Sequence, residues 1–140
     1  MMIFDYLIGN TDRHLLNYGM LYDTNTGEIL GPAPIYDNGL SFFSWDEMPN
    51  SVSEVEDWIK ENDLTMTFSD AGQLEEFLLP EHEEKIRKVS NLSLKPKFEI
   101  GFTKKDAELI HKFLTILCEQ TLDVHHKLFS NDKNIKIPNT

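Results

Sequence analysis

The C-terminal third of the sequence contains the feature that most constrains the fold, a long helix with one apolar face. Thr103, with Asp106 three residues later, resembles a capping box, which marks the start of a helix. Mainly apolar side chains then recur at intervals of three and four residues, at Ile110, Phe113, Leu114, Leu117, Thr121, Val124 and Leu128. A helix cannot bury such a stripe by itself, so the pattern predicts that other elements pack on it.

Several shorter helices are expected before this one. Residues 1–8 are apolar except for Asp5 and run into the turn formers of residues 9–12, which is typical of a helix that ends in a loop. Residues 52–62 predict a short helix after a break at residues 49–51. In the same region the aromatic residues expected to be buried are Phe42, Phe43 and Trp45.

Two further helices are predicted between residues 69 and 89. Ser69 or Asp70 is suited to cap the first, which contains Leu74, Phe77 and Leu78. Pro80 suits the first turn of the second, which reaches about Val89. Together with the long helix, they make the expected fold mainly helical.

One β-hairpin is predicted near the N-terminus. Residues 17–23 have strand-like side chains, and residues 25–27 form a turn before a second short strand at residues 28–30. The prolines of Gly31-Pro32-Ala33-Pro34 cannot continue a helix, so the chain is expected to be extended up to Ile35. We therefore predict a mainly α fold with a small hairpin, and a flexible tail at residues 131–140.

Composition excludes several classes of function. The 140 residues suit one domain, and their formal net charge of -11 argues against direct nucleic-acid binding, which requires clustered Lys and Arg. The sequence has neither a signal peptide pattern nor a long apolar run, so no membrane partner is expected. The one cysteine, Cys118, lies in an apolar stretch and is interpreted as a core residue, which suits a cytoplasmic location.

Two polar segments flank the predicted hairpin and carry the chemistry. The first is Gly9-Asn10-Thr11-Asp12-Arg13-His14-Leu15-Leu16-Asn17, and the second is Ile35-Tyr36-Asp37-Asn38-Gly39. Phosphoryl transfer needs an acceptor for the nucleophile's proton and oxygen ligands for divalent cations. Asp12, Asn17 and Asp37 provide such groups, and the five-position step from Asp12 to Asn17 equals the Asp-to-Asn step of the protein-kinase catalytic loop.

These two segments resemble the catalytic and metal-binding motifs of HipA-like serine/threonine kinases, the toxin kinases of bacterial toxin-antitoxin modules. Asp12-Arg13-His14 with Asn17 is also similar to the Asp-Arg-His-x-x-Asn catalytic loop of phosphatidylinositol 3- and 4-kinases. The resemblance implies a protein-kinase-like C-lobe, spanning residues 1–130 and beginning at the catalytic loop. It also implies ATP and Mg²⁺ as cofactors and transfer of the ATP γ-phosphate to a protein Ser or Thr.

The resemblance gives each polar residue a role. Asp12 is then the base that orients the attacking hydroxyl, while Asn17 and Asp37 are Mg²⁺ ligands. His14 is either a catalytic helper near the developing charge or a strut of the loop. Arg13 either faces a phosphate of the cofactor or pairs with a nearby carboxylate. The alternative without chemistry also stays open, because Asn-Thr-Asp and Asp-Asn-Gly are ordinary turn sequences.

Only eleven residues precede Asp12, too few for the glycine-rich loop, strand lysine and helix glutamate of a kinase N-lobe. We expect this chain alone to be inactive, as a kinase fragment, a split subunit or a decayed remnant. The implied partners are an N-lobe polypeptide or antitoxin-like protein, and a protein substrate. Two other functions stay open: a lipid kinase fragment, and a non-catalytic helical interaction module.

Two smaller expectations concern the rest of the surface. Apolar surface exposed at the position of an N-lobe predicts self-association into a homo-oligomer. His125-His126 and His82-Glu83-Glu84 lack the spacing of a zinc pair on one helical face, so we expect no metal role for these residues.

Overall fold

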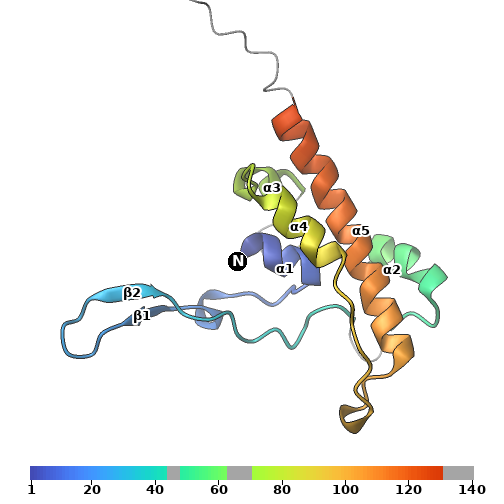
Figure 1. Ribbon diagram of the computed structural model, residues 1–140, viewed down its shortest axis with the longest axis horizontal. Coiled ribbons are helices and arrows are strands. Elements are labelled where there is room, and N and C mark those ends of the chain that lie inside the picture. The colour runs from blue at the N-terminus through green and yellow to red at the C-terminus, as the bar shows by residue number, and fades with distance from the viewer. Residues whose placement is uncertain (44–47, 63–70, 131–140) are drawn as a thin grey trace, which may run out of the picture.

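The computed structural model describes residues 1–43, 48–62 and 71–130, with the side chains of residues 71–73 left aside. Within these ranges the chain is mainly helical, and its two strands form one antiparallel sheet. This confirms the predicted mainly α fold with a small hairpin. Figure 1 shows a body of helices gathered around one long helix, with the hairpin extending away from it.

The long helix is α5, which runs from Lys104 to Phe129. Its predicted capping box is present, because the Thr103 hydroxyl accepts from the Asp106 amide and the Asp106 carboxylate accepts from the Thr103 amide. The predicted stripe is buried at most of its positions, including Phe113, Leu114, Leu117 and Thr121. The helix therefore begins where the sequence predicts and turns the predicted face toward the core.

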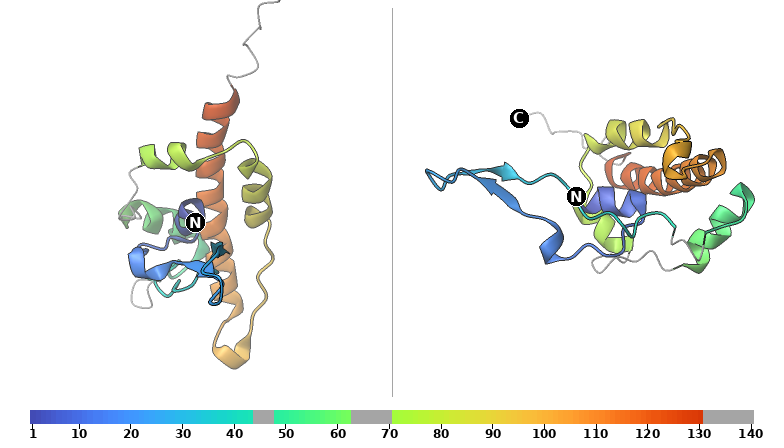
Figure 2. Two further views of the ribbon diagram at one scale, coloured as in Figure 1. Left: turned by 90° about the vertical axis from the view of Figure 1, so that its left-hand side faces the viewer. Right: turned by 90° about the horizontal axis from the view of Figure 1, so that it is seen from below.

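Four shorter helices pack on α5, namely α1 (Met2–Ile8), α2 (Val55–Glu61), α3 (Ala71–Phe77) and α4 (His82–Ser90). Figure 2 shows α4 lying alongside α5 while α1 and α2 contact its other sides. Three single-turn 3-10 helices connect these elements: η1 (Leu15–Asn17), η2 (Val52–Glu54) and η3 (Phe98–Ile100). The core lies where the apolar faces of the shorter helices meet the stripe of α5.

Aromatic side chains fill the centre of this core. The Phe113 ring, fully buried on α5, lies 5.2 Å from Phe43, 5.8 Å from Phe42 and 6.2 Å from Trp58, measured between ring centroids. These edge-on contacts attach the segment after the second polar motif to α2 and α5. Phe42 and Phe43 were predicted to be buried, and both are partly buried. Trp45 lies outside the described residues.

The predicted hairpin consists of β1 (Met20–Tyr22) and β2 (Ile29–Pro32), paired in antiparallel register. Asp23 closes the turn, because its carboxylate accepts hydrogen bonds from the amides of Asn25 and Thr26. Gly27 supplies the left-handed backbone angle (φ 73°) that the turn requires. The hairpin projects from the body as an arm, as Figure 1 shows, and the apolar side chains of both strands are therefore exposed.

The start of α4 differs from the prediction. Pro80 was expected in its first turn, but the helix begins at His82 and Pro80 lies in the turn before it. The turn is closed by His82, whose amide donates to the Leu79 carbonyl and whose Nδ1 accepts from the Leu79 amide. The predicted cap residues Ser69 and Asp70, and the tail at residues 131–140, lie outside the described residues.

Cys118 is fully buried in α5, as its apolar neighbours predict. Burial raises the pKa of its thiol to about 11, so the thiol stays protonated at neutral pH. Among the helices of the described ranges, none combines the length and the apolar character that crossing a membrane requires.

Candidate functional site

A buried ion pair lies at the base of the two polar motifs. Asp5 in α1 is fully buried, and Arg13 in the loop after α1 is 2% exposed. The Arg13 Nε and Nη2 atoms donate to the Asp5 carboxylate at 3.1 Å and 2.8 Å. Two parallel donors on one carboxylate fix the position of the guanidinium as well as neutralising it.

The other side of the same guanidinium joins the two motifs. Nη1 donates to the carbonyl oxygens of Asn17 (3.0 Å) and Tyr36 (2.6 Å), and Nη2 donates to Oδ1 of Asn38 (2.6 Å). Each of the five N–H groups of Arg13 therefore has an acceptor within the chain. The loop of residues 9–17 and the segment of residues 35–39 consequently lie against each other, as their predicted shared role requires.

Asn10 adds a second link between the motifs. Its side chain is fully buried, and its Nδ2 lies 3.3 Å from the Asp5 carboxylate and 3.5 Å from Oδ1 of Asn38. Its own Oδ1 accepts from the amide of Asp12 at 3.2 Å. The backbone at Asp12 is thus fixed from the buried side of the loop.

Asn17 and Asp12 are held together within the first motif. The Asn17 side chain is buried, and its Nδ2 donates to the Asp12 carbonyl at 3.1 Å. In the described part of the chain no donor binds Oδ1 of Asn17, and the Asp12 side chain is exposed without a side-chain partner. Both motif residues therefore offer an oxygen that the fold itself does not use.

Asp37 lies between the two residues of the second motif that Arg13 binds. It has a left-handed backbone (φ 57°), which Asp tolerates better than most residues, and its side chain is exposed. Its negative charge is close enough to Arg13 to help raise the pKa of the guanidinium, after the larger effect of the hydrogen bonds to Asp5.

His14 stabilises the local turn. Its Nδ1 accepts from the Leu16 amide at 3.3 Å and so caps η1, and its ring is exposed. The Tyr36 hydroxyl then donates to the Leu16 carbonyl at 2.7 Å, which ties η1 to the second motif. The hydrogen bond between His14 and Leu16 corresponds to the structural role that was left open for His14. Its direct chemical role stays a prediction.

Arg13 shows the pairing with a carboxylate that the sequence left open, and its partner is Asp5. Facing a phosphate would require the guanidinium to give up one of its present acceptors. The sequence interpretation did not assign Asp5, Asn10 and Asn38 to the site. A signal for Asp5 was present, because it is the one charged residue in the apolar stretch of residues 1–8 and a buried charge needs a partner.

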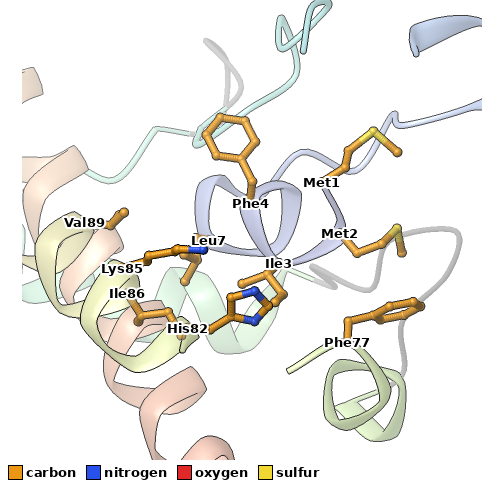
Figure 3. Close-up of a pocket in the computed structure, with 10 residues that line it drawn as sticks. All are labelled: Met1, Met2, Ile3, Phe4, Leu7, Phe77, His82, Lys85, Ile86 and Val89. Atoms are coloured by element: carbon orange, nitrogen blue, oxygen red, sulfur yellow. The ribbon is translucent and has the colours of Figure 1, made fainter. Parts of the chain in front are cut away.

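An apolar hollow of about 480 Å³ lies elsewhere on the body, between α1, α3 and α4. Figure 3 shows Met2, Ile3 and Leu7 of α1 near Phe77 of α3, with His82, Lys85 and Ile86 of α4 beside them. None of the polar motif residues lines it, so it is separate from the candidate site.

Comparison with known proteins does not extend the motif resemblance, because no family model, curated protein or solved structure matches this chain. Assignment of a function therefore depends on the geometry of the two motifs.

Proposed function

We propose that this chain provides the catalytic-loop half of a HipA-like kinase C-lobe, which transfers the ATP γ-phosphate to a protein Ser or Thr when an ATP-binding lobe is supplied. In this proposal Asp12 orients the attacking hydroxyl, while Asn17 and Asp37 hold Mg²⁺. The observation that carries it is the Arg13 contact with both Asn17 and Tyr36, because it brings together two motifs that the hairpin separates in sequence.

The residues present fit a magnesium ion. Mg²⁺ prefers a few hard oxygen ligands and keeps several waters. The Asp12 and Asp37 carboxylates are exposed, and Oδ1 of Asn17 has no donor among the described residues. When bound, the ion would neutralise charge on the transferred phosphate. The chain's own contribution in this proposal is the backbone of the two motifs, which the Arg13 and Asn10 hydrogen bonds hold together.

The residues described here fit the ATP phosphates less well. Arg13, the one Lys or Arg within the two motifs, has all of its donors taken by Asp5, Asn17, Tyr36 and Asn38. In this proposal the groups that bind the phosphates come from the supplied lobe. The engaged donors of Arg13 are consistent with the expectation that the chain alone does not transfer phosphate.

Paramagnetic broadening by Mn²⁺, which takes the same oxygen ligands as Mg²⁺, tests the metal part of the proposal. In ¹⁵N-labelled chain the amide signals near Asp12, Asn17 and Asp37 should broaden first, and excess Mg²⁺ should restore them. Asp37→Asn should weaken the effect at all three positions, because it removes one charged ligand. Glu56→Gln, at an exposed carboxylate on α2, is the matched control and should leave the broadening unchanged.

Broadening spread evenly over the exposed acids, or broadening that Asp37→Asn does not alter, would count against a shared ion. The expected inactivity of the chain alone has its own test with radiolabelled ATP. The chain alone should label neither itself nor a general protein substrate. ATP turnover by the chain that Asp12→Ala abolishes would show that no second lobe is needed.

The exposed hairpin favours a second candidate function, that of a non-catalytic interaction module. Five apolar side chains of the strands are about half exposed or more: Met20, Leu21, Tyr22, Ile29 and Leu30. A two-stranded hairpin by itself is marginally stable, and an exposed apolar surface of this kind is typical of a contact site. Self-association that Leu30→Ser and Ile29→Ser abolish, together with an absence of Mn²⁺ binding at the motifs, would support this alternative.

A further inference from the structure

Three potential metal ligands meet where α4 packs on α5. Glu83 is in the first turn of α4, and His125 and His126 are consecutive residues near the end of α5. One ligand atom of each residue lies within 4.8 Å of the other two. The short segments each lack metal-binding spacing in sequence, and only the packing of the two helices brings the three residues together.

The donor set indicates which ion would fit. Two imidazoles and one carboxylate are ligands typical of zinc sites that keep a further position for water. Mg²⁺ and Ca²⁺ prefer oxygen ligands, so they suit this cluster less well than the Asp12 and Asp37 region. The formal net charge of -11 also favours the approach of a divalent cation over long range.

His125 provides a second and independent observation. It is 3% exposed, and its Nε2 lies 3.1 Å from the Leu79 carbonyl oxygen, so a neutral ring donates from Nε2 and keeps its lone pair on Nδ1. That Nδ1 is buried and has no hydrogen-bond partner among the residues that the structure describes. Ring nitrogens buried in this way usually have a partner, and metal-bound imidazoles commonly donate their other N–H to a backbone carbonyl.

The Arg87 guanidinium contacts two of the three potential ligands, Glu83 and His126. Its Nη2 lies 2.8 Å from Oε1 of Glu83 and 3.4 Å from Nε2 of His126, while Oε1 and Nε2 are 3.3 Å apart. The side chain of Arg87 is 52% exposed, so it can move from the cluster into solvent without crossing a buried region. An exposed ion pair of this kind is weak, and a metal ion with three ligands is expected to displace it.

We propose that Glu83, His125 and His126 bind a Zn²⁺-type divalent cation that ties the start of α4 to the end of α5, with Arg87 as a competing internal cation. The ion would bind the folded chain and not the unfolded one, so it would raise the unfolding midpoint as its concentration rises. This site is independent of the proposed kinase function, because the motif residues take no part in it.

Titration of the purified chain with Zn²⁺, followed by calorimetry, and with Co²⁺, followed by its visible absorption, tests the proposal. We expect one ion per chain. Glu83→Gln and His126→Gln should each weaken binding roughly tenfold or more. His111→Gln changes an exposed histidine elsewhere on α5 and should have no effect. Arg87→Gln is the most informative variant, because removal of the competing cation should tighten binding several-fold.

An ordinary salt-bridge network predicts the opposite result for Arg87. In that case Arg87→Gln leaves Zn²⁺ affinity unchanged or lowers it, and the proposal is wrong. Binding only at millimolar Zn²⁺, or binding that His126→Gln does not weaken, would also overturn it. Circular dichroism of each variant before titration shows whether the fold is retained, and a metal-dependent rise of the unfolding midpoint in the parent chain gives a readout that does not depend on the variants.

Discussion

The loops around Arg13 and the helices around Phe113 are both closely packed, but their surroundings differ in kind. Arg13 contacts a carboxylate, two carbonyl oxygens and an amide oxygen, whereas Phe113 contacts three aromatic side chains within an apolar core. Apolar packing tolerates small displacements, while a buried guanidinium requires each acceptor at a definite place. The comparison indicates that the packing around Phe113 holds the helices together, while the hydrogen bonds of Arg13, called the polar hub below, hold the two motifs together.

The largest expected effect follows from removing the charge at the base of the hub. Asp5→Asn leaves the Arg13 guanidinium buried without its counter-charge, which should cost about 3–5 kcal/mol of unfolding free energy. Urea denaturation followed by circular dichroism measures it. Glu84→Gln is a matched control, because Glu84 also accepts from a cation at a short distance (2.7 Å to Lys88) but at the surface. Equal, small losses in both variants would contradict the assigned role of the hub.

Truncation at the centre of the core tests the other region. Phe113→Ala should lose a comparable amount, about 3–5 kcal/mol, because it leaves a cavity among Phe42, Phe43 and Trp58. Phe113→Leu should lose less, since most of the volume remains. Where Phe113→Ala still folds, the Mn²⁺ broadening at residues 12, 17 and 37 should persist, whereas Asp5→Asn should abolish it. The comparison fails if the two variants affect the metal response alike.

A smaller effect is expected at the tip of the hairpin. Hydrogen bonds from the amides of Thr26 and Asn25 lower the pKa of Asp23 below its ordinary value of 3.8. The ionised carboxylate therefore stabilises the turn above that value, and the contribution is lost as the pH falls through the lower pKa of the folded state. Carboxyl ¹³C shifts measured between neutral and acidic pH should show this. Asp23→Asn keeps the side-chain acceptor and should remove the pH response of the turn, and an Asp23 pKa at or above 3.8 would contradict it.

The sequence predicted those features that depend on local signals. The capping box at Thr103 with the apolar stripe after it, and the turn residues between the strands, each determine their conformation within a few positions. The predicted start of α4 was two residues too early. The hydrogen bonds between His82 and Leu79 close a turn that includes Pro80, and the helix begins after it. Local propensity does not reveal whether Pro80 lies in the first turn of the helix or in a separate turn before it.

The roles of the candidate site residues stay predictions, whereas the connections between the motifs can be compared with the structure. The spacing of the two motifs selected the oxygen-bearing side chains as candidates, but it did not assign Asp5 as the partner of Arg13. The Glu83, His125 and His126 cluster could not be found from spacing, because its members meet only through the packing of α4 on α5. Contacts of this kind form only when the helices pack together, so the spacing of residues in the sequence does not reveal them.

The most direct test of the account is NMR observation of the Arg13 guanidinium. Five engaged N–H groups in a buried site predict resolved, slowly exchanging Nε–H and Nη–H signals at neutral pH. These signals should show nuclear Overhauser contacts to Asp5, to Asn17 and to the segment containing Tyr36 and Asn38. A single averaged guanidinium signal in fast exchange with water, or contacts to Asp5 alone, would show that the two motifs are not held together and would contradict the proposed site.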